Sequence, residues 1–245
     1  MTAVFTGEEI IEVCRGRLAS GLMPAEAGAI QSDTRLLADG DWYVAFSGER
    51  FDGHDFLGDA FSCGALGAIV GERPNYPIGS QSFPLIAVED TLVAYHLLAR
   101  NWRKRISPKV IGVTGSSGKT TTKELLWTLL SSTYRCHKNE KNFNNEIGVP
   151  HALLGLQQEH EFSVIEMGMN HIGEIARLSN ITRPDISIIT SVGEGHLEFL
   201  GNVENVARAK AEIVGGMKPN SILYLNADSP YGDIALQAAR EHSVR

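Results

Sequence analysis

One segment, residues 110–130, constrains the fold more than any other part of this sequence. The apolar run 110–113 leads into a turn rich in glycine and serine, and a helix-forming stretch follows. The turn contains Gly115, Ser116, Ser117, Gly118, Lys119, Thr120 and Thr121. Glycines let backbone N–H groups point at an anion, and the start of a helix adds the positive end of its dipole. The segment therefore predicts a strand, a phosphate-binding loop and a helix in succession.

Two side chains of this loop have the chemistry that a nucleotide requires. Lys119 supplies positive charge for the outer phosphates, and the Thr120 hydroxyl can reach Mg²⁺. The general pattern G-x-x-x-x-G-K-[ST] would place a glycine at position 113, where this sequence has Val113. The alternative is a Gly-Lys-Thr that occurs by chance in a surface turn. The strand and helix signals on either side favour the phosphate loop.

Length, charge and cysteine content limit the class of protein. The 245 residues are enough for one large or two ordinary domains. The formal charge of −7 argues against nucleic acid as the main partner, because a phosphate backbone requires a basic face. Three cysteines without C-x-x-C spacing argue against a disulfide framework or a zinc site. No apolar run reaches about 18 residues, so we expect a soluble, cytoplasmic protein without membrane insertion.

The first part of the chain alternates between helix and strand signals. Thr6 and Glu9 form a capping box that predicts a helix start. Strands are predicted at 42–46, 65–70 and 84–88, and helices at 55–63 and 91–104. The basic cluster 103–105 followed by Ser-Pro indicates a junction, and a solvated helix end explains it better than a nucleic-acid patch. We therefore expect a small α/β domain at 1–104 and a second domain at 105–245.

The second domain alternates more clearly. Its predicted strands are 109–114, 162–166, 185–190 and 221–225, and its predicted helices are 119–132, 171–179, 203–216 and a last one from about 231. Continuous apolar strands are typical of a parallel sheet that is buried on both faces. The expected fold is a doubly wound, mostly parallel α/β domain. Ligands of such sheets bind beyond the carboxyl ends of the strands.

Three residues near predicted strand ends or on the helix 203–216 are candidates for chemistry. Glu166 ends an apolar strand, where a phosphate-loop protein places a Mg²⁺ or water ligand; a solvated carboxylate is the alternative. His196 lies in a glycine-rich loop after the next strand and can be a metal ligand or a structural residue. Lys210 lies on the apolar face of its helix. It either extends its amine to solvent or has a depressed pKa and a chemical role, and the sequence leaves both open.

Five motifs in order resemble the Mur ligases, ATP-dependent amide-forming enzymes of peptidoglycan synthesis. They are Thr114-Gly-Ser-Ser-Gly-Lys-Thr-Thr121, Asn142-Phe-Asn-Asn-Glu-Ile-Gly-Val-Pro150, Glu166-Met-Gly-Met-Asn-His-Ile-Gly-Glu-Ile175, Gly195-His-Leu-Glu198 and Ala209-Lys-Ala-Glu-Ile213. The short phosphate loop is the form found in that family. The third motif is similar to the branch that adds D-alanyl-D-alanine. Segments 32–35 and 46–56 are similar to the UDP-sugar-binding domain of the family.

The resemblance implies a reaction and its ligands. ATP would phosphorylate the terminal carboxylate of UDP-N-acetylmuramoyl-tripeptide, and D-alanyl-D-alanine would attack the acyl phosphate, giving ADP and phosphate. Residues 1–104 would bind the UDP substrate, and 105–245 would form an incomplete ATP-binding domain. Because ligases of this family have a third domain, we expect the chain to be a truncated form with little activity alone. We expect it to be a monomer.

The resemblance also implies a set of site residues. Lys119, His196 and Lys210 would be catalytic. The loop residues 115–121 with Asn144 and Asn145 would bind ATP. Thr120 and Glu166 would hold one Mg²⁺, and His196 with a carbamylated Lys210 a second, which favours the chemical role of that lysine. The substrate-binding residues would be Thr34, Arg35, Ser47, Gly48, Arg50, Asp52, His54, Asn170 and His171.

Two other functions remain open from the sequence. The first is a sibling ligase of the same fold that adds a different amino acid or acts on folate. The second is a nucleotide-binding module without ligase activity. Such a module has no requirement for Lys210 or for the first domain, so a role for both would favour a ligase.

Overall fold

The computed structural model describes the chain except residues 1–2, 49–50, 74, 77–82, 141–142 and 196. The chain divides into two compact units, Met1–Asn101 and Trp102–Arg245. The division lies within helix α3 (Thr91–Ile106), and the boundary expected between 104 and 105 falls in the same helix. Each unit has its own sheet.

In the described part of the first unit, six strands form one sheet in the order β1-β3-β4-β5-β6-β2. The inner strands are parallel, and the edge strands β1 and β2 run antiparallel to their neighbours. The strands are β1 Val4–Thr6, β2 Arg17–Ser20, β3 Ala27–Gln31, β4 Trp42–Val44, β5 Gly67–Gly71 and β6 Leu85–Val88. The helices are α1 Gly7–Cys14, the 3₁₀ turn η1 Gly53–Phe56, α2 Leu57–Ser62 and the start of α3. The predicted capping box at the start of α1 is confirmed, with Thr6 and Glu9 bonded in both directions.

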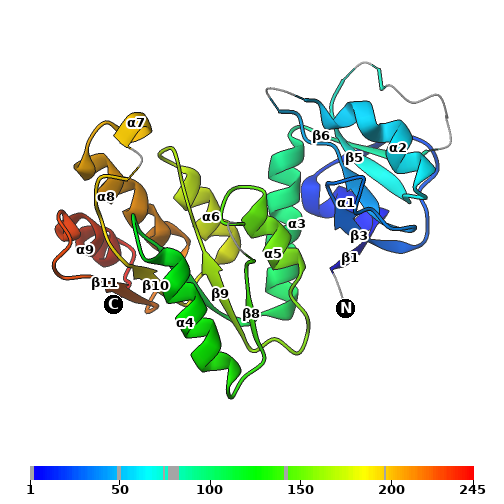
Figure 1. Cartoon of the computed structure of the whole chain (residues 1–245). Helices are drawn as coiled ribbons and strands as arrows, with labels where there is room; N and C mark the ends of the chain where they lie inside the picture. The colour runs from blue at the N-terminus through cyan, green and yellow to red at the C-terminus, as the bar shows by residue number, and fades with distance from the viewer. Residues whose placement is uncertain (1–2, 49–50, 74, 77–82, 141–142, 196) are drawn as a thin grey trace. The chain divides into compact units, whose positions relative to one another are not determined.

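The second unit has a fully parallel sheet in the order β11-β10-β7-β9-β8. Its strands are β7 Lys109–Thr114, β8 Cys136–Lys138, β9 Phe162–Glu166, β10 Ile186–Ile189 and β11 Ile222–Leu225. Its helices are α4 Lys119–Ser131, α5 Gly148–Leu154, α6 Glu174–Thr182, α7 Leu197–Leu200, α8 Val203–Ala211, the 3₁₀ turn η2 Glu212–Gly216 and α9 Gly232–Glu241. The chain crosses toward β8 through α4 and toward β11 through α6 and α8 (Figure 1). Because right-handed crossovers in opposite directions lie on opposite faces, the fold is doubly wound, as predicted.

Burial on both faces explains why the inner strands read as continuous apolar runs. Val113 and Val164 are fully buried at the centre of the second sheet. On one face they pack with Leu126, Trp127 and Leu130 of α4. This packing holds α4 against the sheet, so the loop between β7 and α4 is held between a rigid strand and a rigid helix.

Helix α5, which begins at Gly148, was not predicted; Pro150 is tolerated there because the N–H groups of the first helical turn have no intrahelical partners. Two sequence predictions need correction at their boundaries. The helix expected at 171–179 begins later, at Glu174, because Gly173 adopts a left-handed conformation and caps it. The helix expected at 203–216 changes at Glu212 to a 3₁₀ turn.

The remaining global features are simple. All three cysteines, Cys14, Cys63 and Cys136, are free thiols. Among the described residues, no helix combines the length and the apolar composition that crossing a membrane requires.

Candidate nucleotide and metal site

The phosphate loop joins the end of β7 to the start of α4. Gly115 has φ 154° and Gly118 has φ 81°, conformations that side chains disfavour. A Cβ atom at Gly115 would lie 1.9 Å from Thr190 Oγ1, so only glycine fits there. The Lys119 ammonium donates to the Gly115 carbonyl at 2.7 Å and thus folds back over its own loop.

Val113 explains why the loop is shorter than the general pattern. It is fully buried in β7 and is paired with Glu166 of β9 on one side and Ile188 of β10 on the other. A strand residue with neighbours on both sides cannot also be part of the turn. The absence of glycine at position 113 therefore follows from the strand extending to Thr114.

The segment after β10 holds the phosphate loop in place. The backbone N–H of Ser116 donates to the Ser191 carbonyl at 3.0 Å, and that of Ser117 donates to Ser191 Oγ at 2.9 Å. Thr190 Oγ1 donates to the Ser117 carbonyl at 2.6 Å. The N–H of Gly193 donates to Ser116 Oγ at 3.0 Å. The ends of two neighbouring strands therefore meet, as the parallel topology predicts.

Glu166 lies at the same edge of the sheet and is 1% exposed. Thr120 Oγ1 donates to Glu166 Oε2 at 2.9 Å, and Asn144 Nδ2 donates to Glu166 Oε1 at 2.8 Å. A carboxylate beside a hydroxyl is the type of oxygen donor set that suits a hard cation such as Mg²⁺. Among the described residues, however, no group of three or more His, Cys, Asp or Glu could hold a metal ion.

Lys210 is buried, with 1% of its surface exposed. It therefore does not extend its amine to solvent, which was one of the two alternatives from the sequence. Burial, together with the nearby charge of Lys119, lowers the pKa of Lys210 to about 7. Burial also lowers the pKa of Lys119, although Glu166 opposes that effect. A neutral amine at Lys210 is thus accessible near neutral pH. His196, the other predicted ligand of a second metal ion, lies outside the described residues.

Residues 113–245 match the family described as the Mur ligase middle domain. The chain belongs to the Mur ligase family. The predicted resemblance is confirmed.

Eight curated relatives of this Mur ligase chain, 33–46% identical to it, carry one name. The UDP-N-acetylmuramoyl-tripeptide–D-alanyl-D-alanine ligase of Synechocystis sp. is 46% identical over 200 residues, which cover 82% of this chain and 44% of the relative. The ligase of the same name from Escherichia coli is 38% identical over 224 residues, covering 91% and 48%. The chain therefore spans about half the length of the curated relatives it matches.

Solved structures agree with the sequence matches. A crystal structure of MurF from Acinetobacter baumannii superposes with a TM-score of 0.92 at 33% identity, covering 99% of this chain and 53% of that one. MurF ligase from Thermotoga maritima, solved in complex with ADP, gives a TM-score of 0.79 at 35% identity, covering 89% and 49%. Both support the α/β fold derived above.

Two further buried residues, Lys123 and Asn139, support the position of Glu166. Lys123, on α4, is fully buried, and its amine donates to the Asn139 carbonyl at 2.9 Å. Asn139 is also fully buried and hydrogen-bonds both the N–H and the carbonyl of Glu166. Lys123 follows Lys119 by one helical turn, and this spacing was the signal that could have identified it.

Glu212 is a further residue that the sequence reasoning missed. Its carboxylate accepts from the N–H groups of Gly173, at 2.8 and 3.0 Å, and of Ala176, at 3.1 Å. Burial raises the pKa of Glu212, although these donors oppose the rise. The contact joins the turn after Lys210 to the first turn of α6, and only its place in the motif 209–213 pointed to it.

The other predicted residues of the second unit lie near the site but are partly used in local structure. Asn145 Oδ1 accepts from the N–H groups of Ile147 and Gly148 at 3.2 and 2.8 Å, so it shapes the turn before α5. Thr121 is exposed. Asn170 and His171 are exposed as well, and both are bonded to Glu174, which accepts from the Asn170 N–H at 2.7 Å and contacts His171 Nδ1 at 3.0 Å.

In the first unit, the predicted substrate loop is organised around Asp52. Asp52 accepts from Arg73 Nη2 at 2.8 Å and from the His54 N–H at 3.0 Å, and it contacts the His54 ring. Burial raises the pKa of Asp52, but these hydrogen bonds outweigh it and hold the pKa well below its usual value. His54 is 1% exposed, and its Nε2 accepts from the Gly71 N–H at 2.9 Å. Both ring nitrogens of His54 are therefore used, one by Asp52 of the loop and the other by Gly71 of β5.

Among the remaining first-unit candidates, Arg35, Ser47 and Gly48 face solvent. Ser47 is exposed, and its hydroxyl donates to Asp52 at 3.3 Å; Gly48 is exposed too. Thr34 is half-buried, and the Arg35 side chain is 86% exposed and forms a two-point contact with Asp33. Arg50 lies outside the described residues. Arg35 and Ser47 can thus contact a ligand without any rearrangement of the core.

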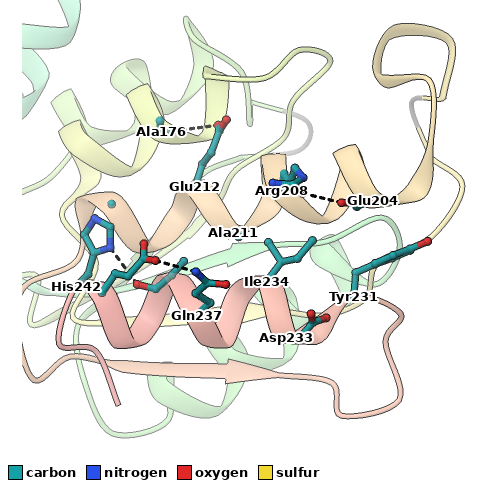
Figure 2. A pocket seen from close by; sticks show the side chains of 13 residues that line it. Ala176, Glu204, Arg208, Ala211, Glu212, Tyr231, Asp233, Ile234, Gln237 and His242 are labelled. Carbon is teal, nitrogen blue, oxygen red and sulfur yellow. Dashed lines mark hydrogen bonds and ion pairs between the residues drawn. The ribbon is translucent and has the colours of Figure 1, made fainter.

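A separate cavity of ≈ 720 Å³ lies in the second unit, between α8 with η2 and α9. Figure 2 shows Glu204 and Arg208 on one side of it, joined at 2.6 Å, and Asp233 and Gln237 on the other. Its described lining contains none of the residues predicted for the nucleotide site. The cavity therefore does not extend the phosphate-loop site.

Proposed function

We propose that this chain is the part of an ATP-dependent ligase that binds ATP and UDP-N-acetylmuramoyl-tripeptide. The ligase would join the tripeptide to D-alanyl-D-alanine. The observation that carries the proposal is the phosphate loop beside the Thr120–Glu166 pair, with the oxygens 2.9 Å apart. The choice of substrates is supported by the names of the relatives, which are 38–46% identical in the two cases given above.

The proposed reaction has two balanced steps. The γ-phosphoryl group of ATP moves to the terminal carboxylate of the tripeptide, giving an acyl phosphate and ADP. The amine of D-alanyl-D-alanine then attacks the acyl carbon, phosphate leaves with the electron pair of the broken C–O bond, and the amine loses a proton. Two anions must meet in the first step, so positive charge and fixed positions are the main requirements.

The residues of the loop can meet those requirements. Lys119 and the N–H groups of 115–121 would bind the phosphates, with Asn144 and Asn145 close to the nucleotide. Thr120 and Glu166 would hold a Mg²⁺ ion. When bound, that ion supplies charge neutralisation for the phosphates. In this role Lys119 leaves the Gly115 carbonyl and turns to the ligand.

Lys210 and His196 would hold a second Mg²⁺. The lowered pKa of Lys210 makes a neutral amine available, and its reaction with CO₂ gives a carbamate and a proton. A carbamate replaces a buried cation by an oxygen ligand, which suits a hard metal. Incubation with ¹³CO₂ should give a carbamate signal by NMR that is lost in Lys210→Met.

Residues 1–104 would bind the UDP-sugar part of the substrate, and 105–245 would bind ATP. Arg35, Ser47 and Gly48 are exposed, and with Thr34 and Arg50 they are the candidates for direct contact. Asp52 and His54 would hold their loop in shape. Asn170 and His171 would contact substrate from the second unit. We place the reaction in the cytoplasm, where ATP is available, and expect a monomer.

Binding measurements test the proposal directly. Calorimetry with the 245-residue chain should show ADP binding that Mg²⁺ strengthens, and separate binding of UDP-N-acetylmuramoyl-tripeptide. UDP-N-acetylmuramoyl-dipeptide and a folate substrate are the controls that test for a sibling ligase. A preference for either control would reassign the substrate, and a failure to bind ADP would contradict the nucleotide site.

A further inference from the structure

Lys123 is the most unusual charged residue of the second unit that the proposed mechanism does not use. It is fully buried on α4. Its Nζ atom lies 2.9 Å from the Asn139 carbonyl oxygen, 3.4 Å from Glu124 Oε1 and 3.7 Å from Glu166 Oε2. Burying an ammonium group costs several kcal/mol unless its charge and its donors are satisfied. A methionine or leucine would fill the same space without that cost, so the charge calls for an explanation.

Asn139 provides one connection from Lys123 to Glu166. Asn139 Oδ1 accepts from the Glu166 N–H at 2.9 Å, and its Nδ2 donates to the Glu166 carbonyl at 3.0 Å. The same Nδ2 also donates to the Phe143 carbonyl at 2.7 Å. By holding the Asn139 backbone, Lys123 holds the residue that fixes both backbone polar groups of Glu166. Phe143 adjoins Asn144, which binds the carboxylate itself.

Charge provides the second connection. The Glu166 carboxylate is 1% exposed, and its hydrogen-bond donors among the described residues, Thr120 and Asn144, are neutral. The Lys123 ammonium is the cation with an ion-pair contact to it in the described structure. Lys123 is fully buried, whereas Thr120, the other α4 residue that contacts the carboxylate, is exposed next to the phosphate loop.

We propose that Lys123 is a positioning residue that holds the Glu166 carboxylate in place for Mg²⁺ at the phosphate loop. Because it is fully buried, it touches neither nucleotide nor substrate. It acts through Asn139 on the backbone of Glu166 and through its charge on the carboxylate. The proposal rests on the proposed function, since it assumes that Glu166 binds Mg²⁺ beside ADP or ATP.

The test separates metal binding from phosphate binding. ADP affinity of the full 245-residue chain is measured by calorimetry in EDTA and in MgCl₂, for the wild type and Lys123→Met. Methionine keeps an unbranched apolar stem of similar length. We expect an unchanged affinity in EDTA, because the phosphate loop is intact. We expect the strengthening by Mg²⁺ to fall by about 10-fold or more, which is the usual effect of losing an outer-sphere partner of a metal ligand.

Lys138→Met is the matched control. Lys138 also pairs with Glu124 and lies over the Trp127 ring, but it has no ion pair with Glu166 in the described structure. Its Mg²⁺ effect should equal that of the wild type. Lys123→Gln, which keeps a donor for the Asn139 carbonyl, should lose less of the Mg²⁺ effect than Lys123→Met.

The possible results are distinct. An equal Mg²⁺ effect in wild type and Lys123→Met would overturn the role of Lys123 and leave the proposed function standing. So would failure of both Lys123 variants to fold while Lys138→Met folds, since the lysine would then serve the fold. A wild type that does not bind ADP would instead contradict the nucleotide site, and with it both proposals.

Discussion

The phosphate-loop edge of the second unit and the 47–54 loop of the first unit use polar residues in different ways. At the phosphate loop, groups far apart in sequence converge: Thr120 meets Glu166, and Ser117 meets Ser191. In the 47–54 loop, most polar contacts are made within the loop or with the adjoining strand, as between Asp52 and His54. At the phosphate loop, polar groups from several elements therefore face a common point. In the 47–54 loop, the polar groups are already hydrogen-bonded to one another.

This difference shows which predicted residues the structure leaves available. In the described part of the chain, the Lys119 ammonium donates to carbonyls of its own loop, so a ligand can compete for it. His54 is buried with both ring nitrogens occupied, so a ligand would have to break the loop to reach it. A residue type that is suitable for binding is therefore weaker evidence of a ligand contact when its polar groups are already hydrogen-bonded within its own loop.

The largest effect is expected for Lys119→Met. Loss of the charge that meets the phosphates should weaken ADP binding by about 100-fold, since hydrogen bonds to charged groups are worth about 1.5–3 kcal/mol each. Calorimetry measures the affinity, and Lys104→Met, an exposed lysine of α3, is the control. A similar loss of ADP affinity in the control, or no loss in Lys119→Met, would contradict the claim that Lys119 is available to bind a ligand.

His54→Ala should act on stability instead. It leaves the Gly71 N–H and the Asp52 carboxylate without the buried His54 ring and opens a cavity, so we expect a loss of about 3 kcal/mol from the first unit. Hydrogen exchange of first-unit amides measures the loss, and ADP binding should not change. If stability stayed the same and only binding of the UDP substrate disappeared, His54 would be a direct ligand.

His137 tests whether a half-buried histidine of the second unit also affects stability. Burial, aided by the charge of His160, lowers the pKa of His137 to about 4 from the ordinary 6.5. Between these values the unfolded chain binds more protons, so the free energy of unfolding falls as the pH drops from 6.5 toward 4. From pH 7 to 5 this group alone should cost about 2 kcal/mol.

The measurement for His137 is urea denaturation at both pH values. His137→Gln should reduce the pH dependence, whereas His242→Gln, which replaces an exposed histidine of the same unit, should leave it unchanged. Equal pH dependence in wild type and His137→Gln would show that the ring is not held neutral by the fold.

The smallest effect on stability is expected for Arg35→Ala. Its contact with Asp33 is a surface ion pair with an 86% exposed arginine, and such pairs contribute little. Thermal unfolding should therefore shift very little, while the affinity for UDP-N-acetylmuramoyl-tripeptide should fall measurably. A change in stability without a change in affinity would move Arg35 to the class of residues that hold the loop.

Much of the fold could be read from periodicity, and the reasons for the failures are physical. The strand β7 and the helices α4 and α8 begin where they were predicted, because each combines an apolar pattern with a turn or cap at its start. Strand β8 and helix α5 were not predicted. They are short, and their pairing with β9 and burial depend on tertiary contacts.

The site was predictable to the same extent. Glu166 was found because it ends a buried strand, and Thr120 because it follows the glycine and lysine of the loop. Lys123 was missed although it follows Lys119 by one helical turn, because that spacing alone does not say that a lysine of an amphipathic helix points into the core. Which of the predicted residues bind ligand stays a prediction that the variants above address.

The contact between the Lys119 ammonium and the Gly115 carbonyl, at 2.7 Å, has a consequence for selectivity. The Gly115 carbonyl competes with any ligand for the Lys119 ammonium, so a ligand gains only the difference between the two interactions. A nucleotide with one phosphate offers the lysine little more than the carbonyl does, whereas ADP and ATP present a second and third phosphate. The affinity of the loop should therefore depend on the number of phosphates in the nucleotide. AMP should remain a poor ligand even at concentrations that saturate the site with ADP.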